Sequence, residues 1–430
     1  MSSETAASSS VPRLDPGLRL SLSIMMFLEF AIWGAWFVNF YPYLTGKGFS
    51  DVQAGAVMGN MALGAIISTM FAGHIADRLF ASERMMAVLH LLGAGMLYWM
   101  AQIQKPEEYG LLFAVSLVYA LFYNPTLALT NSIALTHVPT ATRDFPGLRV
   151  FGTIGWIVSG LLVDSLFKQS GVSPDGQPIV IPASASNGPL LLAAAMSAVL
   201  GVYSLLLPHT PPTGKAGEPM PFVKALGLFR DPSFAVFFTV SFAITIVLAF
   251  YYTTTSAFLE SAAKVTSTTS TMAIGQVCEM IFLPLLPFFL FGMGMKWVLA
   301  LGMFCWGLRY FLFAHGGPEG FPFVLVLIGV ALHGFCFDFF FAAGFIHVDN
   351  EAPRDIRASG QALFGFLTYG VGMWLGNLLA GWLKGHFTVD GIVDWRSFWL
   401  VPAAGVMLAL IVFVVFFRMH PSKQPEPVAV

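Results

Sequence analysis

The chain has 430 residues, of which 57% are hydrophobic and only 10% are charged. Soluble domains carry about 25% charged residues, so this composition predicts a polytopic membrane protein. The net charge of −2 gives no excess of basic residues for binding nucleic acid or an anionic membrane surface. The three cysteines, Cys278, Cys305 and Cys336, lie in apolar stretches at spacings that fit no metal site. We therefore expect a protein of the lipid bilayer with no metal, no cofactor and no nucleic-acid partner.

Twelve segments are long and apolar enough to be membrane-spanning helices, since about 20 apolar residues are needed to cross the hydrocarbon core. They are residues 17–43, 52–76, 84–102, 109–135, 146–167, 189–208, 232–259, 267–291, 296–314, 321–347, 359–383 and 396–418. The predicted fold class is all-α. Residues 1–16 lack the basic start and apolar core of a signal peptide, and we expect them to form a disordered cytoplasmic tail.

The distribution of basic residues predicts the orientation, because cytoplasmic loops are enriched in Lys and Arg. With the N-terminus inside, thirteen of the 21 Lys and Arg residues fall on the cytoplasmic side or its border. Six fall outside, and Arg149 and Arg309 lie within spans. Both termini, including a tail over residues 419–430, are therefore expected in the cytoplasm.

A Pro- and Gly-rich cytoplasmic linker over residues 209–231 divides six spans from six. Two comparable halves, residues 17–208 and 232–418, are typical of a duplicated transporter. Within the linker, residues 220–229 are predicted to form a short helix on the inner surface. The hydrophilic stretch 168–188 is expected to be an outside loop with turns.

The loop between spans two and three, GHIADRLFASER, contains Gly73, Asp77, Arg78 and Arg84. It resembles the loop signature of the major facilitator superfamily, with the second glycine replaced and the basic end reduced. Asp77 is expected near the start of a helix at Ser359, and the two arginines near acids such as Glu351 or Asp355, as a cytoplasmic gate. The alternative is that the arginines only obey the positive-inside rule.

Span five begins with RDFPGLRVFGTIGW, in which Arg149, Thr153 and Trp156 share one helix face. A cation, a hydroxyl and an indole on one face suit a flat polar ligand. Alternatively, Arg149 extends its head into water at the interface. Gly152 and Gly155 beside this face are expected to allow close helix packing.

Span eight places Gln276 and Glu279 on one face among apolar residues. Buried polar groups need partners, so these two are predicted to face a ligand cavity. The alternative is a structural ion pair between Glu279 and Arg309 of the next span.

Span ten contains His333, Phe337 and Asp338 in a run that is otherwise aromatic and apolar. A carboxylate at the bilayer centre costs about 2.5–3.5 kcal/mol, so Asp338 indicates a functional site. His333 alone is typical of a hydrogen-bonded packing residue, but beside Asp338 a proton-carrying role is equally plausible.

Span one carries Glu29, Trp33 and Trp36 on one face. These residues are expected to line the same cavity from the other half. The alternative for the two tryptophans is that they face lipid or anchor the helix at the interface, as membrane tryptophans commonly do. Tyr123, Asn124, Thr126, Thr130 and Asn131 of span four are weaker candidates, since most such groups serve helix contacts.

Several strings together resemble the nucleoside:proton symporter family of the major facilitator superfamily, the bacterial nucleoside permeases. They are WGAW, RDFPGLRVFGTIGW, GQVCEM followed by LPFFL, WGLRYFLFAHGGP, GFCFDFF and DIRASGQALF. The resemblance runs from span one to the final span. It implies a proton-driven importer of the inner membrane, with two six-helix halves and a nucleoside site between them.

The resemblance also implies roles for individual residues. Arg149 and Thr153 match the family's binding arginine and threonine, Trp156 its aromatic ring, Gln276 and Glu279 the span-eight amide and acid, and Phe337 and Asp338 the span-ten aromatic and acid. His333 stands where the family commonly has a tyrosine. In span seven, Ala249 and Tyr252 replace two amide side chains, so the substrate or its pose is expected to differ. Tyr251, Tyr252 and the threonines Thr253 to Thr255 can supply hydroxyls to the substrate instead.

These observations predict a transporter that imports nucleosides with protons by alternating access. Asp338 is the first choice for the proton carrier and Glu279 the second, while Trp33, Trp156 and Phe337 are expected to stack on the base. The expected assembly is a monomer. A carrier of another solute, such as a sugar, a nucleobase or a drug, remains the alternative. A membrane enzyme or receptor is disfavoured, because no catalytic motif is present.

Overall fold

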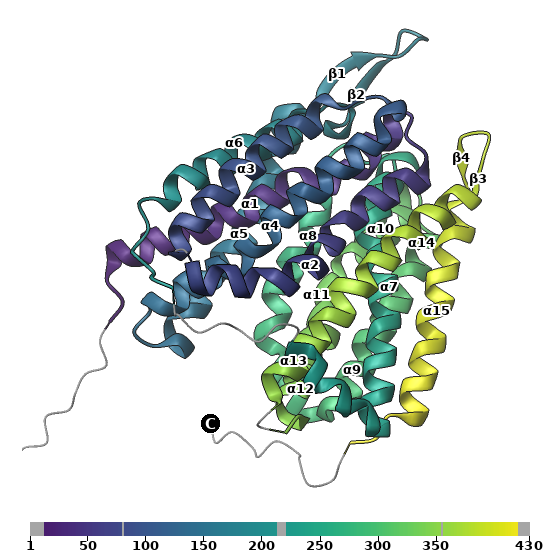
Figure 1. Ribbon diagram of the computed structural model, residues 1–430. Helices are drawn as coiled ribbons and strands as arrows, with labels where there is room; N and C mark the ends of the chain where they lie inside the picture. The colour runs from purple at the N-terminus through teal and green to yellow at the C-terminus, as the bar shows by residue number, and fades with distance from the viewer. Residues whose placement is uncertain (1–12, 80, 213–220, 354–355, 420–430) are drawn as a thin grey trace, which may run out of the picture.

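The computed structural model describes residues 13–79, 81–212, 221–353 and 356–419, with only the backbone described at 69–79, 142 and 221. In these residues the chain is almost entirely helical (Figure 1). Nine helical stretches are long and apolar enough to cross a membrane, judged on the described residues. Large apolar side chains such as Phe291, 77% exposed, cover the outer surface, as a lipid-facing surface requires.

The purple to teal helices lie together in Figure 1 and form the first part of the fold. They are α1 (Pro16–Gly46), α2 (Asp51–Leu79), α3 (Ser82–Gln102), the 3₁₀ turn η1 (Pro106–Glu108), α4 (Tyr109–His137), α5 (Ala141–Phe167) and α6 (Gly188–Ser204). Their bounds agree with the first six predicted spans to within several residues.

The loop after α5 is more ordered than the sequence suggested. Strands β1 (Gln169–Val172) and β2 (Pro178–Ile181) pair as an antiparallel hairpin. Gly176 takes a φ of 78° in the turn, a conformation that glycine adopts at no steric cost. A short turn, η2 (Ala183–Ala185), then leads into α6.

The green to yellow helices form the second part, which begins with η3 (Pro221–Arg230) on the linker. A short helix was expected here, and its presence is confirmed; its place on the inner surface stays a prediction. The remaining elements are α7 (Pro232–Ser261), α8 (Thr268–Phe282), η4 (Leu283–Leu285), α9 (Leu286–Ala314), α10 (Gly320–Ala331), α11 (His333–Phe337), η5 (Asp338–Ala342), α12 (Ala343–Glu351), α13 (Arg357–Gly365), η6 (Phe366–Gly372), α14 (Met373–His386), β3 (Thr388–Val389), β4 (Ile392–Val393) and α15 (Trp395–Phe416).

Three of these stretches depart from regular α-helix. Gly294 has a φ of 74° inside α9, so the chain turns there, between predicted spans eight and nine. Stretches α10–α12 and α13–α14 each contain a π-helical segment, η5 and η6. Such segments occur frequently at functional sites, and η5 begins at Asp338.

Helices α1 and α5 approach each other closely through glycine. A Cβ atom on Gly155 would lie 2.1 Å from the carbonyl oxygen of Phe27, and one on Gly34 would lie 2.9 Å from the Cα atom of Trp156. Small residues at these positions allow backbones to touch in lipid, as expected for Gly155. The contact fixes the tryptophans of α1 and α5 relative to each other.

We expect Gly155→Ala to lower stability by about 1–3 kcal/mol, because the added methyl group forces α1 and α5 apart. The midpoint of thermal unfolding in detergent measures this change. Gly95→Ala in α3 is the matched control, since its Cβ would meet no atom within 4 Å. An equal shift in both variants would contradict the packing role of Gly155.

Candidate substrate and proton site

The α1–α5 contact builds an aromatic wall with one cation. The Trp33 ring lies 5.3 Å from Trp156 and 6.2 Å from Tyr123, both edge-on. The guanidinium of Arg149 lies 4.1 Å from the centre of the Phe30 ring, a cation–π contact. Arg149 is only partly buried, so its donors remain available to another group.

Helices α8 and α11 also meet through glycine, and this contact positions the acidic side. A Cβ on Gly275 would lie 2.8 Å from the Cβ of His333, and one on Gly334 would lie 2.7 Å from the backbone of Cys278. As a result, His333 Nε2 lies 3.9 Å from Glu279 Oε2. The same nitrogen lies 3.4 Å from the hydroxyl of Tyr252 on α7.

Asp338 lies at the first residue of η5 and is 1% exposed. Its Oδ2 atom has no hydrogen-bond partner among the described residues. It interacts electrostatically with Glu279, so two acids from different helices share this region. A buried carboxylate oxygen without a donor is a position for a proton or for a hydrogen bond from a ligand.

The two parts of the fold meet at these residues. Arg149 of α5 interacts electrostatically with Glu279 of α8. The Phe37 ring of α1 lies 6.3 Å from Tyr252 of α7, edge-on. One cation and two acids, with aromatic rings on both sides, can bind a flat polar molecule and a proton.

The other predicted site residues surround this cluster. The Phe337 ring lies 5.7 Å from His333, and the His333 ring contacts Tyr251 and Tyr252 of α7. Thr153 and Gln276 are partly buried on α5 and α8 and carry no contact that adds to the site. Their roles stay predictions.

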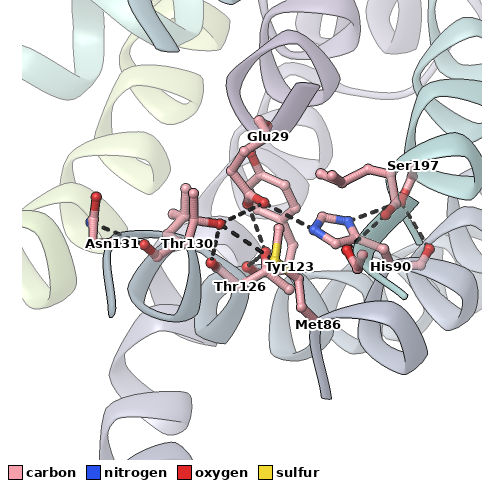
Figure 2. A network of polar contacts seen from close by, with 11 residues as sticks. Glu29, Met86, His90, Tyr123, Thr126, Thr130, Asn131 and Ser197 are labelled. Carbon is pink, nitrogen blue, oxygen red and sulfur yellow. Dashed lines mark hydrogen bonds and ion pairs between the residues drawn. The ribbon is translucent and has the colours of Figure 1, made fainter. Parts of the chain in front are cut away.

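The structure contradicts two contacts that the sequence suggested, the ion pair of Arg309 with Glu279 and the placement of Glu29 beside Trp33 in the site. Arg309 does not pair with Glu279. Its guanidinium lies 3.9 Å from the centre of the Tyr251 ring and donates to the Gly329 carbonyl oxygen at 2.8 Å. Glu29 does not face the cavity with Trp33, because its carboxylate turns into the first part of the fold and bonds His90 (Figure 2).

Some of the altered residues of span seven pack against neighbouring helices, and others lie at the site. Ala249 is fully buried and lies where a Cβ on Gly376 would approach it to 2.5 Å, so it faces α14. The hydroxyl of Thr253 bonds Asn377, and that of Thr254 bonds the carbonyl oxygen of Phe250. Two tyrosines of this stretch reach the acidic side: the Tyr251 ring stacks on His333 at 5.1 Å, and the Tyr252 hydroxyl lies near the same ring.

Sequence reasoning missed Phe37, and Tyr369, which interacts electrostatically with Glu279. Phe37 lies four residues after Trp33 on α1, and this spacing was the available signal. Tyr369 lies in η6, where the π-helical turn changes the helical register. No sequence spacing indicates such a change.

The gate residues are only partly described. The side chains of Asp77 and Arg78, and all of Asp355, lie outside the described residues. Arg84 is 74% exposed and lies 4.0 Å from Glu83. Its gate role stays a prediction.

Comparisons with known proteins show the family of the chain. A family model described as Nucleoside H+ symporter matches residues 17–422. The putative nucleoside transporter YegT of Escherichia coli K12 is 39% identical over 410 residues, covering 92% of this chain and 93% of that protein. The xanthosine permease of the same organism is 32% identical, covering 96% of this chain and 98% of its own length.

Solved structures give the same result for the fold. A crystal structure of the nucleoside transporter NupG superimposes with a TM-score of 0.83 at 30% identity, covering 94% of this chain and 100% of that chain. The POT family transporter PepTSo, at 13% identity and a TM-score of 0.70, shares the fold alone. The chain belongs to the nucleoside H+ symporter family.

Proposed function

We propose that this symporter imports a nucleoside together with a proton, by alternating access of one site between two six-helix halves. The observation that carries the proposal is the cluster of Arg149, Glu279 and Asp338, which joins α5 to α8 and η5. Arg149 and Glu279 hydrogen-bond the ligand. Trp33, Trp156 and Phe337 stack on the base, because aromatic rings bind a flat heterocycle with little loss of entropy.

Asp338 is the proton carrier in this mechanism. Its unpartnered oxygen and its acidic neighbour both favour a bound proton, since two adjacent carboxylates repel each other when both are ionised. Substrate that draws Arg149 and Glu279 together changes the charge around Asp338. Proton binding and substrate binding are thereby coupled.

The topology that goes with this mechanism has twelve crossings of the inner membrane and both termini in the cytoplasm. The halves are residues 17–208 and 232–418, joined by the linker 209–231, with cytoplasmic tails at 1–16 and 419–430. The protein works as a monomer in the bilayer, because one chain supplies both walls of the site.

Nucleoside uptake into proteoliposomes under an imposed pH gradient, acid outside, tests the proposal. We expect accumulation that disappears when an ionophore collapses the gradient. Competition by nucleosides, nucleobases and sugars separates the nucleoside from the other solutes. Accumulation that sugars inhibit and nucleosides do not would overturn the substrate assignment. This assignment is the most informative point to test, because Ala249 and Tyr252 replace the two amide side chains of the family.

Two polar contacts join the halves at one end of the molecule. The distribution of Lys and Arg predicts that this end faces outside the cell. Lys384 of α14 lies 2.6 Å from Asp51 of α2, and both are nearly buried. Asp164 Oδ2 of α5 accepts from the backbone N–H of Ser270 on α8 at 2.7 Å. A site reached from outside requires these contacts to break.

We expect Lys384→Gln to favour the outward-open state, because breaking a buried ion pair costs about 3–5 kcal/mol. The readout is the rate at which an impermeant maleimide labels Thr269→Cys, in a background without the native cysteines. Thr269 is buried where α8 meets α5, so labelling should rise at least about tenfold. Exchanging the two charges, Asp51→Lys with Lys384→Asp, should slow labelling again.

The control is Lys168→Gln, which removes an exposed contact to Ser267 on the same side. Exposed contacts contribute about 0–1 kcal/mol, so its labelling rate should stay near that of the parent. Equal rates in both Gln variants would contradict a latch at Lys384.

A further inference from the structure

A second buried pair of ionisable groups lies inside the first part of the fold, apart from the site above. Glu29 of α1 and His90 of α3 are 0% and 1% exposed, and Glu29 Oε2 lies 2.9 Å from His90 Nε2 (Figure 2). Both residues lie near the middle of apolar stretches that can cross the membrane, Pro16–Gly46 and Ser82–Gln102. Ionisable groups at this depth are costly and commonly functional.

Hydrogen-bond directions around His90 define how many protons the pair holds. Ser197 Oγ donates its single proton to the His90 carbonyl oxygen at 2.8 Å. Its oxygen therefore accepts from His90 Nδ1, which lies 3.3 Å away. The other ring nitrogen, Nε2, faces a carboxylate oxygen of Glu29.

With the Ser197 proton on the carbonyl oxygen, two proton arrangements satisfy this pattern. Either both ring nitrogens carry protons and His90 is a cation, or Glu29 is protonated and donates to Nε2 while Nδ1 keeps its proton. In both cases the pair holds one proton more than a carboxylate and a neutral imidazole. The pair is then neutral overall, which avoids an uncompensated buried charge.

The hydroxyl groups of α4 suit either arrangement. Thr126 Oγ1 lies 2.7 Å from Glu29 Oε1 and 2.6 Å from the Tyr123 carbonyl oxygen. Thr130 Oγ1 lies 3.1 Å from Glu29 Oε2 and 2.8 Å from the Thr126 carbonyl oxygen. Each hydroxyl can donate to the carboxylate or turn to the backbone, so the cluster tolerates gain and loss of a proton.

Among the described residues, no other charged side chain contacts Glu29 or His90 directly and compensates a charge on the pair. Tyr119 and Tyr123 of α4 interact electrostatically with Glu29. In the part of the chain that the structure describes, charged or titratable side chains of other helices contact α1 away from the pair: Asp51 of α2 and Lys384 of α14 at Tyr41, Arg149 of α5 at Phe30, Tyr203 of α6 at Ser21, and Tyr252 of α7 at Phe37.

We propose that Glu29 and His90 form a second proton-binding site, which holds one exchangeable proton within the first half of the transporter. The site is linked to the aromatic wall, because the Tyr123 hydroxyl donates to the Glu29 carbonyl oxygen at 2.7 Å and its ring contacts Trp33. Loss of the proton leaves a buried negative charge and shifts α1 against α4. The occupancy of this site thereby adjusts the wall that covers the substrate.

Infrared difference spectra of the full chain in liposomes test this site, recorded between about pH 5.5 and 9, where exposed carboxyls with pKa values near 4 stay ionised. We expect a titrating carboxyl or imidazole band that is lost in Glu29→Gln and kept in Asp338→Asn. His90→Gln, a second variant in case the first does not fold, should also remove or displace this band, because it takes away the hydrogen-bond partner of the Glu29 carboxyl.

Spectra of Glu29→Gln and of His90→Gln that coincide with the wild-type spectrum would overturn the proposal. A purely structural pair predicts that coincidence, because no proton would then exchange. The experiment uses no substrate, so its failure is distinct from a failure of nucleoside uptake. Conversely, an intact Glu29-dependent band with no nucleoside uptake would contradict the proposed function alone.

Discussion

Asp338→Asn is expected to abolish accumulation of nucleoside driven by a pH gradient, leaving uptake at the level seen with the gradient collapsed. The amide keeps the size of the buried side chain but cannot bind or release a proton. Substrate affinity should be retained, because Arg149 and Glu279 are unchanged. Uptake with and without the imposed gradient, and nucleoside affinity by calorimetry, together measure both outcomes.

Asp390→Asn is a matched control for this variant. Asp390 is exposed in the β3–β4 turn with a φ of 51°, a conformation that Asn adopts readily. It should leave gradient-driven uptake unchanged. Uptake in Asp338→Asn that still followed the pH gradient would exclude Asp338 as the proton carrier and leave Glu279 as the next residue to test.

Arg149→Ala should weaken nucleoside binding about 10- to 100-fold, since a hydrogen bond to a charged group is worth about 1.5–3 kcal/mol. The loss removes both the guanidinium donors and the positive charge that interacts with Glu279. Arg149→Lys should restore only part of the affinity, because an ammonium group lacks the planar fork of guanidinium. Calorimetric titration of the purified variants with a nucleoside measures these changes.

The control for Arg149 is Arg396→Ala, at an exposed position near the start of α15. It removes the same side chain without reaching the cluster, so affinity should not change. If Arg149→Ala bound nucleoside as tightly as the parent, the substrate would lie elsewhere. The alternative that Arg149 only extends its head into water would then be preferred.

Helices and buried acids were predictable from local sequence, whereas the partners of the polar side chains were not. Apolar length predicted the helices well, because lipid leaves the backbone no partner outside its own helix. The burial of Asp338 away from lipid also followed from sequence, because a carboxylate exposed to hydrocarbon is costly. Glu29 was assigned to the cavity incorrectly, since one helix face shared with Trp33 does not define which neighbouring helix that face meets.

The membrane class, the helical stretches and the polar residues that are costly to place in lipid all followed from the order of residues in the chain. The tertiary structure decided which of them meet. Contacts of α8 with α11, through Gly275 and Gly334, bring Glu279 to His333. Packing of α1, α3 and α4 instead encloses Glu29 with His90. Partner choice depends on helix rotation and close approach, and these are set by long-range packing that no local spacing records.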